Sequence, residues 1–119
     1  MDWIAKHSRQ VKKTIDWLEA SGFLAAKVEF TGTMGKHYKK QDLWGADVAF
    51  RNQWMIGFIQ VKSSLGKNNR NIKEGVKQLT DDHWPMAVRR YVIHWPNRAK
   101  RPRIWNVKTG EEFSVNSTI

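Results

Sequence analysis

The sequence predicts an α/β domain in which helices pack on a central mixed sheet of five strands. Two segments carry apolar residues at the three- and four-residue spacing of an amphipathic helix, and five others are rich in β-forming residues. Along the chain they follow the order helix, three strands, helix, two strands. A length of 119 residues fits one domain, residues 1–119, built around one hydrophobic core.

The first predicted helix ends at Gly22, a residue type that is common just after the last turn of a helix. Val11, Ile15 and Leu18 recur at spacings of four and three, which places them on one face. Ser8 is a candidate N-cap for the start of this helix.

Three predicted strands follow, at residues 27–31, 47–50 and 54–62. The basic segment GTMGKHYKKQD, between the first and the second of them, is expected to be a loop. The third strand is apolar on both of its faces. A strand of this kind belongs in the middle of a sheet that is covered on both sides.

A second helix and two further strands are predicted in the second half of the chain. Ile72, Val76 and Leu79 form another apolar stripe at helical spacing, and Pro85 follows it. The two strands cover residues 87–95 and 103–107, and the basic loop PNRAKRPR joins them.

The chain is strongly basic, with 21 Lys and Arg against 11 Asp and Glu and a formal net charge of +10. This charge favours a polyanionic partner, with nucleic acid as the first candidate and an anionic membrane surface as the second. The longest apolar run, residues 54–59, is far shorter than the ~20 residues that span a bilayer, so no membrane partner is expected. A basic protein without a polyanionic partner is the remaining alternative.

The absence of cysteine excludes disulfide bonds, thiol catalysis and cysteine-based zinc sites. The first residues, MDWIAKHSRQ, lack the apolar stretch of a signal peptide. We therefore expect the protein to act in the cytoplasm of the cell that makes it.

Three polar residues are expected to meet at the ends of the second and third strands. Gln60 and Lys62 end the third strand, and they share a face because they are two positions apart. Asp47 lies thirteen positions before Gln60, at the start of the second strand, and a tight turn brings it alongside them. Polar residues at the end of an apolar strand need a reason, because burying them without partners is costly.

Phosphodiester cleavage is one such reason. The hard cation Mg²⁺ prefers oxygen ligands, which here are the Asp47 carboxylate, the Gln60 side-chain carbonyl and the Val61 backbone carbonyl. The metal polarises the phosphate and acidifies a water molecule, while Lys62 holds that water or neutralises charge on the phosphate. The alternative is a turn aspartate, a strand-end glutamine and a surface lysine with no joint role.

The segments DLWGADVAF and GFIQVKS resemble the signature of the PD-(D/E)XK nucleases. The helix ending in LEASGF, the helix with VKQL, and the strands RRYVIHW and RIWNV follow the order seen in archaeal-type Holliday junction resolvases, so the resemblance covers residues 8–107. It implies a restriction-endonuclease-like core and dependence on Mg²⁺, with Mn²⁺ as a substitute. It also implies that Asp47 binds metal, that Gln60 occupies the second acidic position and that Lys62 is the catalytic lysine.

The sequence departs from this family at two acidic positions. The family has Glu or Asp where this chain has Gln60, although relatives resembling the Mrr restriction nucleases also carry glutamine there. The resolvases have a glutamate near the start of the first helix, where this chain has Val11 with Gln10 beside it. The acidic residues that could replace it are Asp16, Glu19, Glu29 and Asp42. For Asp42 the alternative is a loop aspartate that caps the following turn.

Two basic segments are expected to contact DNA phosphates on either side of the metal site. The predicted DNA-binding residues are Lys36, His37, Lys39, Lys40, Ser63, Arg98, Lys100, Arg101 and Arg103. Solvated loops are the alternative for both segments. The four histidines show no spacing suited to one metal site, and we interpret them as structural or DNA-facing.

Seven tryptophans are a large number for so short a chain. The pattern places Trp17, Trp54 and Trp95 in the core. Trp44, in the DLWG turn, has two interpretations: it stacks on a base, or it packs under the site.

These features together predict a structure-selective endonuclease that acts on branched DNA, most simply a Holliday junction resolvase. A four-way junction has two-fold symmetry, so such an enzyme is expected to be a homodimer. The resemblance points to a prokaryotic cell or a phage-infected host. Two rivals remain: a restriction-like or single-strand nuclease of the same fold, and a DNA-binding module whose catalytic site has decayed.

Overall fold

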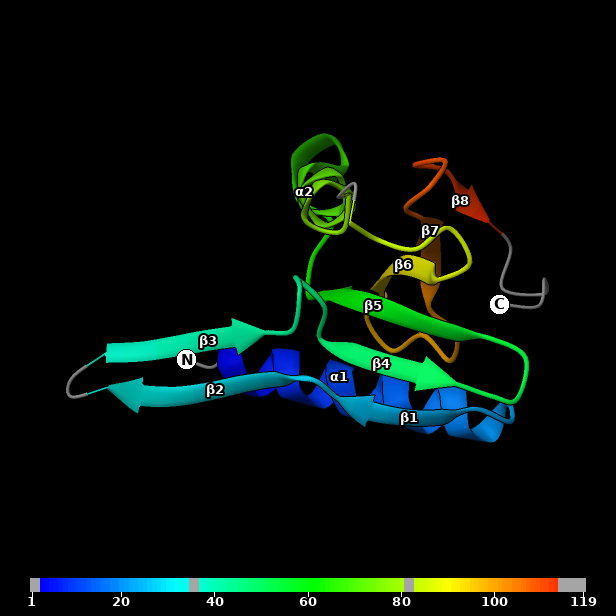
Figure 1. The fold of residues 1–119 in the computed structure, drawn as a ribbon. Helices are drawn as coiled ribbons and strands as arrows, with labels where there is room; N and C mark the ends of the chain where they lie inside the picture. The colour runs from blue at the N-terminus through cyan, green and yellow to red at the C-terminus, as the bar shows by residue number, and fades with distance from the viewer. Residues whose placement is uncertain (1–2, 35–36, 81–82, 114–119) are drawn as a thin grey trace.

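The computed structural model describes residues 3–34, 37–80 and 83–113, without the side chains of residues 3, 4 and 30–42. It shows two α-helices and a six-stranded mixed sheet, which confirms the α/β class (Figure 1). No helix among the described residues has the length and apolar character needed to cross a bilayer.

The central sheet has the strand order β1-β4-β5-β6-β7-β8, with one strand more than the sequence predicted. Its members are β1 (Leu24–Lys27), β4 (Val48–Arg51), β5 (Ile56–Lys62), β6 (Arg89–His94), β7 (Arg103–Asn106) and β8 (Glu112–Phe113). Strands β5 and β6 are parallel, and all other neighbours are antiparallel. A parallel pair needs a crossover connection, and α2 (Arg70–Gln78), preceded by the short helix η1 (Lys67–Asn69), provides it.

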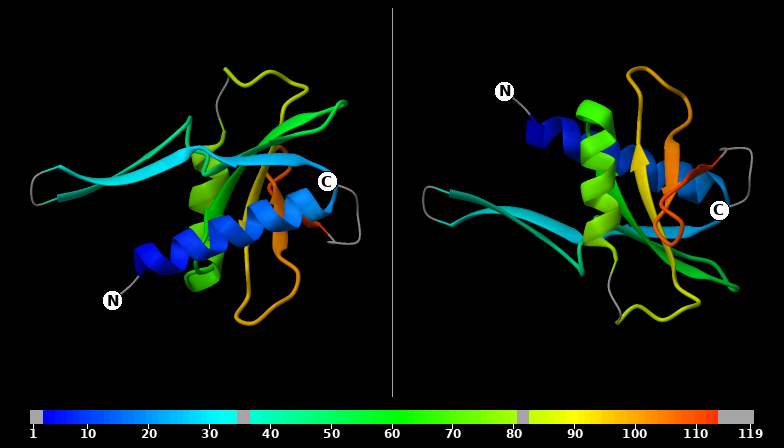
Figure 2. Two further views of the ribbon diagram at one scale, coloured as in Figure 1. Left: turned by 90° about the horizontal axis from the view of Figure 1, so that it is seen from below. Right: turned by 90° about the horizontal axis from the view of Figure 1, so that it is seen from above.

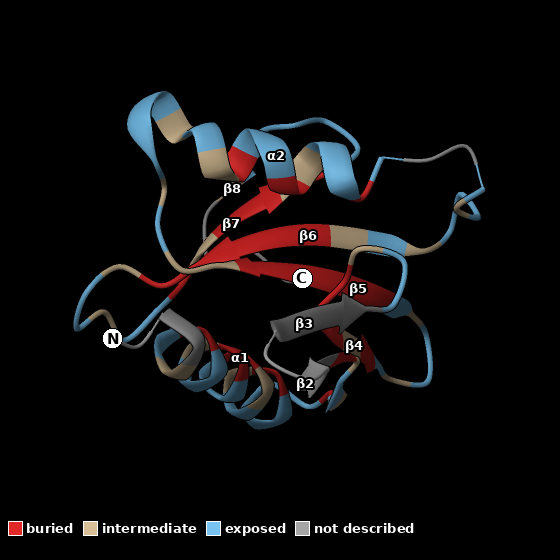
Figure 3. Ribbon diagram, turned by 90° about the vertical axis from the view of Figure 1, so that its left-hand side faces the viewer, coloured by how far each residue is buried: buried red, intermediate tan, exposed pale blue. Residues whose placement is uncertain are grey.

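The two helices cover opposite faces of the sheet (Figures 1 and 2). On one face, α1 (Trp3–Ala20) buries Val11 and Leu18 against Ile59 and other apolar residues of the sheet. On the other face, α2 packs its own apolar residues against Phe58 and its neighbours. Because side chains alternate along a strand, β5 supplies both cores. The buried strands accordingly lie between the two helices, as Figure 3 shows.

A second, two-stranded sheet replaces the loop that was predicted for residues 32–42. Strands β2 (Glu29–Met34) and β3 (His37–Asp42) pair antiparallel and extend away from the central sheet (Figures 1 and 2). The predicted strand at residues 27–31 is therefore divided at Val28 between the two sheets. The polar and basic residues of this segment resemble those of a loop, which is why the sequence analysis predicted one.

Two predicted boundaries were wrong for local reasons. Helix α1 begins at Trp3, so Ser8 lies inside the helix and is not its cap. Strand β5 begins at Ile56, because the side-chain oxygen of Asn52 accepts the N–H groups of Trp54 and Met55 and extends the turn. Trp54 is consequently 80% exposed and is not a core residue. Strand β8, of two residues, was too short to be predicted.

The other two tryptophans assigned to the core lie where they were expected. Trp95 is buried and Trp17 is partly buried, and their rings meet edge to face at a centroid distance of 6.3 Å. The Trp95 indole N–H donates a hydrogen bond to the hydroxyl of Thr14, which is itself buried in α1. This contact fixes α1 against the end of β6.

Candidate metal centre and nucleic-acid interface

Asp47 is held in the interior by three hydrogen bonds with neighbouring strands. Its N–H donates to the carbonyl of Ile59 at 2.8 Å, and its carbonyl accepts the N–H of Val28 at 2.9 Å. Its carboxylate oxygen Oδ2 accepts the N–H of Val61 at 2.8 Å, and the residue is fully buried. The carboxylate therefore lies beside β5 at the peptide between Gln60 and Lys62, as the tight turn predicted.

Two further ligand-type side chains adjoin this carboxylate. His7 Nε2 lies 2.9 Å from Glu29 Oε2 and 3.8 Å from Asp47 Oδ2. All three side chains are buried, with 11%, 1% and 0% of the His7, Glu29 and Asp47 side chains exposed. One ligand atom from each lies within 4.8 Å of the other two. These three residues are called the HED group below.

The composition of the HED group fits a divalent cation. Two carboxylates in a dry interior repel each other unless positive charge lies between them. A metal ion bound by the three side chains would supply that charge. Carboxylate oxygens suit Mg²⁺ and Mn²⁺, and an imidazole nitrogen shifts the preference toward transition metals.

The sequence left open whether the first helix supplies Asp16, Glu19 or no acidic ligand. Asp16 and Glu19 both lie on the exposed side of the helix, where Asp16 accepts a hydrogen bond from Lys12 at 2.9 Å. The helix contributes His7 instead, which the sequence had not singled out as a ligand. Helical periodicity could have indicated that His7 is buried, because it precedes the buried Val11 by one turn and continues the buried stripe of the helix.

Of the two acidic residues outside the helix, one joins the group. Glu29, the first residue of β2, is the carboxylate that contacts His7. The side chain of Asp42 lies outside the described residues, but its backbone pairs with that of Glu29 in the β2–β3 register.

Gln60 and Lys62 belong to the opposite face of the sheet. Strand β5 directs Ile59 and Val61 into the core under α1, and the alternation sends Gln60 and Lys62 toward α2. A Cβ placed on Gly75 of α2 would come within 3.2 Å of Lys62 Cε, so α2 approaches this lysine closely. Asp47, bonded to Val61, is the link between the HED group and this second pair.

Lys62 is positioned at both its side chain and its backbone. Its ammonium donates a hydrogen bond to Gln78 Oε1 of α2 at 3.2 Å. Its carbonyl accepts a 2.9 Å hydrogen bond from Nδ1 of the buried His94 on the neighbouring strand. A carbonyl can only accept, so His94 carries a hydrogen on Nδ1.

Gln60 is 2% exposed, and its amide oxygen has no hydrogen-bond partner among the described residues. A buried acceptor without a partner is costly, and a cation bound by this oxygen would remove that cost. The burial of this oxygen without a partner is therefore consistent with the prediction that Gln60 is a metal ligand, although Gln60 lies on the α2 face.

A basic cleft opens where α1 passes the ends of β5 and β6. It has a volume of about 730 Å³, and its cationic lining comes from Lys6, Arg9 and Lys13 of α1 and from Arg98. Ser63, directly after Lys62, also lines it. Ser63 and Arg98 were predicted DNA contacts, whereas the three cations of α1 were not.

The remaining predicted DNA-binding residues have different settings. Arg103 donates two hydrogen bonds to the Glu112 carboxylate, at 2.7 and 2.8 Å, and these raise the pKa of Arg103 and lower that of Glu112. Its charge is thus neutralised within the sheet. Lys100 and Arg101 are exposed on the β6–β7 loop. Lys36 lies outside the described residues, and so do the side chains of His37, Lys39 and Lys40 on β3.

No family model, no curated protein and no solved structure matches this chain.

Proposed function

We propose that this chain is a metal-dependent DNA endonuclease with a restriction-endonuclease-like core, and that it cleaves branched DNA such as the Holliday junction. The observation that carries the proposal is the buried HED group, in which Asp47 is also bonded to the strand between Gln60 and Lys62. The basic cleft beside the same strand end, together with a net charge of +10, supports a polyanionic substrate.

The residues have separate parts in such a reaction. His7, Glu29 and Asp47 would hold Mg²⁺ or Mn²⁺, and the bound ion would polarise the scissile phosphate and acidify a water molecule. The Lys62 ammonium, held by Gln78, supplies positive charge to neutralise the phosphate as the P–O bond breaks. His94 positions the backbone of that lysine from the next strand.

The basic cleft supports a role in positioning the DNA backbone. Lys6, Arg9, Lys13 and Arg98 present four cationic side chains to one hollow. Lys13 is also fixed there, since its ammonium donates to the Ala99 carbonyl at 2.7 Å and lies 4.6 Å from the centre of the Trp95 ring. Phosphate contacts of this kind orient the duplex without reading its sequence. We propose a homodimer, because a two-fold symmetric junction requires two active sites.

A cleavage assay on three DNAs of matched sequence tests the proposal: a synthetic four-way junction, a linear duplex and a single strand. Each is incubated with Mg²⁺, with Mn²⁺ and with EDTA. The variants are Asp47→Asn, which keeps the shape of the side chain but removes its charge, and Asp16→Asn, a control for an exposed carboxylate of α1. We expect symmetric junction cleavage that needs a divalent ion, is lost in Asp47→Asn and is unchanged in Asp16→Asn.

Each other outcome has a definite meaning. Preferred cleavage of duplex or single strands would keep the nuclease and overturn the resolvase. Junction binding without cleavage under any metal condition would support a DNA-binding module with a decayed site. Wild-type cleavage by Asp47→Asn would remove the HED group from the active site. Sedimentation of the free protein and of the junction complex checks the homodimer.

A further inference from the structure

A pocket of about 680 Å³ lies on the α2 face of the sheet, and three aromatic rings form much of its wall. Phe58 lies 5.0 Å from Trp84 and 5.8 Å from Trp44 between ring centroids, and the two indoles are also 5.8 Å apart. The three rings are inclined to one another by 55°, 67° and 89°. They therefore enclose a recess rather than a flat patch. Its volume is within the range of about 300–1,000 Å³ that is usual for small-ligand sites.

Trp44 has an unfavourable backbone conformation, and the residue is too exposed for its burial to offset that cost. It is 65% exposed and has a φ of 54°, and the next residue, Gly45, has a φ of 85°. The turn is closed by the Ala46 N–H, which donates to the Leu43 carbonyl at 2.9 Å. Turns with two positive φ angles favour Asn, Asp and Gly, and a bulky residue there is an outlier. A ligand that uses the exposed indole would account for the tryptophan.

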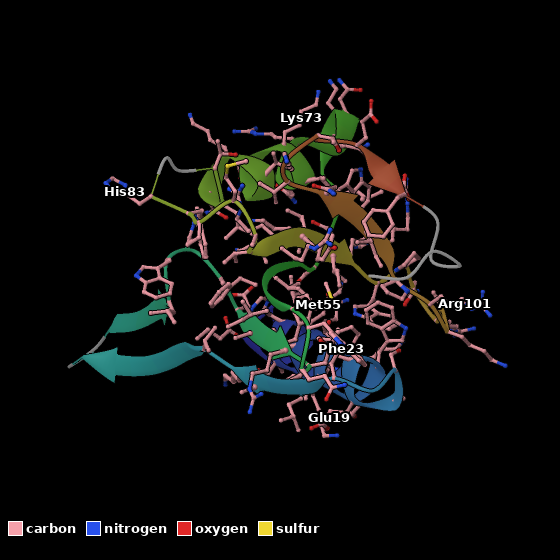
Figure 4. The ribbon with its side chains drawn as sticks, turned by 45° about the vertical axis from the view of Figure 1, so that its right-hand side comes forward. Glu19, Phe23, Met55, Lys73, His83 and Arg101 are labelled. Carbon is pink, nitrogen blue, oxygen red and sulfur yellow. The ribbon has the colours of Figure 1, made fainter. Side chains whose placement is uncertain are left out.

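The pocket is one side chain away from Lys62. Gln78 lines the pocket, and its Oε1 accepts the hydrogen bond from the Lys62 ammonium. Because that oxygen is used, the amide nitrogen of Gln78 remains as a donor toward a ligand. His83 also lines the pocket, and Figure 4 shows it at the outer end of the loop after α2, far from Arg101 on the β6–β7 loop.

The charge around the pocket selects the kind of ligand. Inclined aromatic rings can bind either an organic cation or a flat ring. Arg90 already lies over Trp84, with its guanidinium carbon 5.7 Å from the ring centre, and the whole chain has a net charge of +10. A cationic ligand would be repelled. A nucleobase carried on an anionic strand satisfies both the aromatic wall and the positive surroundings.

We propose that the pocket binds an unpaired nucleobase of the DNA strand, so that the attached phosphate is presented toward Lys62. This inference rests on the proposed nuclease function, and it names what the substrate must offer. Bases of an intact duplex are stacked and cannot enter, whereas those at a branch point or in a single strand can. Stacking on aromatic side chains contributes through the face of any base, so the pocket selects DNA structure and not sequence.

Binding of oligothymidylate in EDTA tests the proposal, because it needs no cleavage. The matched probe is the same strand with abasic residues, which keeps the phosphates and removes the bases. We expect wild-type protein to bind the abasic strand about tenfold more weakly. Trp44→Asn should bind both strands with the same low affinity, while its thermal stability is unchanged or higher because asparagine suits the turn. Trp54→Ala, at an exposed tryptophan outside the pocket, should discriminate as wild type does.

Two results would overturn the proposal. The first is equal wild-type affinity for the two strands. The second is preserved discrimination in a folded Trp44→Asn protein. If that variant also changes its oligomeric state, the pocket is a contact between two copies of the chain. A protein that discriminates the two strands but cleaves no DNA would support base binding by the pocket and refute only the proposed nuclease function.

Discussion

The two faces of the central sheet carry opposite chemistry at the same strand end. Under α1, the HED group gathers two carboxylates and an imidazole in the interior, where we propose that a cation binds. Under α2, the ammonium of Lys62 lies beside Gln78 and the aromatic pocket, where we propose that the DNA strand and its unpaired base bind. Asp47 joins the two faces through the N–H of Val61. In the proposed reaction, β5 would therefore lie between the metal ligands under α1 and Lys62 under α2.

Replacing Lys62 should give the largest effect that is confined to the α2 face. In Lys62→Ala we expect the cleavage rate at saturating metal to fall by about 100-fold or more, because a positive charge at the phosphate is lost. The metal concentration for half-maximal rate should stay unchanged, since the HED group is intact. Single-turnover cleavage across a metal titration measures both quantities.

Lys77→Ala is the matched control for Lys62→Ala, because Lys77 is an exposed lysine of α2. It should leave both the rate and the metal dependence as in wild type. Normal cleavage by Lys62→Ala would mean that this residue is only a surface charge. The α2 face would then have no part in catalysis through Lys62.

Replacing His7 should show the reverse pattern, with an effect on metal binding rather than on rate. His7→Ala removes one of the three proposed ligands, so we expect the Mn²⁺ concentration for half-maximal rate to rise by about tenfold or more, with the rate recovered at high metal. Calorimetric titration with Mn²⁺ alone gives the same comparison without cleavage. Ser8→Ala changes the exposed neighbour in the same helix and should do neither.

If His7→Ala leaves the Mn²⁺ affinity unchanged, His7 is not a metal ligand and its role is structural. The variant should then show only the cost of leaving Glu29 buried without its 2.9 Å partner, roughly 1–3 kcal/mol of unfolding free energy. Chemical denaturation in EDTA measures that cost, so it can be separated from the loss of metal.

The sequence located Asp47, Gln60 and Lys62 better than it located the two residues that adjoin Asp47 in the HED group. The apolar run before Gln60 and Lys62 predicted a buried strand with two polar residues at its end, and the tight turn placed Asp47 beside it. These are local relations, which alternation and short connections determine. The class of fold followed from the two helical stripes in the same way.

The HED group was hidden because its members are far apart along the chain. His7 lies twenty-two positions before Glu29, and helical periodicity marks its face as buried without naming its partner. The β2–β3 hairpin was hidden for another reason, since its polar residues resemble those of a loop. Trp54 shows a third limit: its apolar character suggested a core position, but the turn at Asn52 leaves it in solvent.

Gln60→Glu tests whether the two faces share one cation. We expect a few-fold lower metal requirement with activity kept or raised, because hard divalent cations favour charged oxygen ligands. The added carboxylate would be buried at a residue that is now 2% exposed, so the variant should be less stable in EDTA and regain stability with Mn²⁺. Thermal melts with and without Mn²⁺ measure this difference.

An unchanged metal requirement in Gln60→Glu would confine the cation to the α1 face. A variant that folds and binds DNA but has lost cleavage would mean that the Gln60 amide acts as a hydrogen-bond donor to the phosphate. In that case the metal-ligand role of Gln60 would be wrong, and the proposed cation would be bound by the HED group without Gln60.

The smallest effect is expected at the sheet edge, where Arg103 and Glu112 form an ion pair that belongs to neither face. The hydrogen bonds from Arg103 lower the pKa of Glu112 below its ordinary value. A lowered pKa means that the ionised pair stabilises the fold fully above that ordinary value, and that this stability is lost as the pH falls through the folded-state pKa. Glu112→Gln should therefore cost about 0.2–1 kcal/mol at pH 7, the usual range for a solvent-exposed pair, and cost nothing near pH 2. Urea denaturation at the two pH values measures the difference, and Glu111→Gln is the control at the adjacent exposed carboxylate.

If Glu112→Gln instead tightens DNA binding more than Glu111→Gln does, the released Arg103 contacts DNA after all, and the predicted basic run extends to the sheet edge.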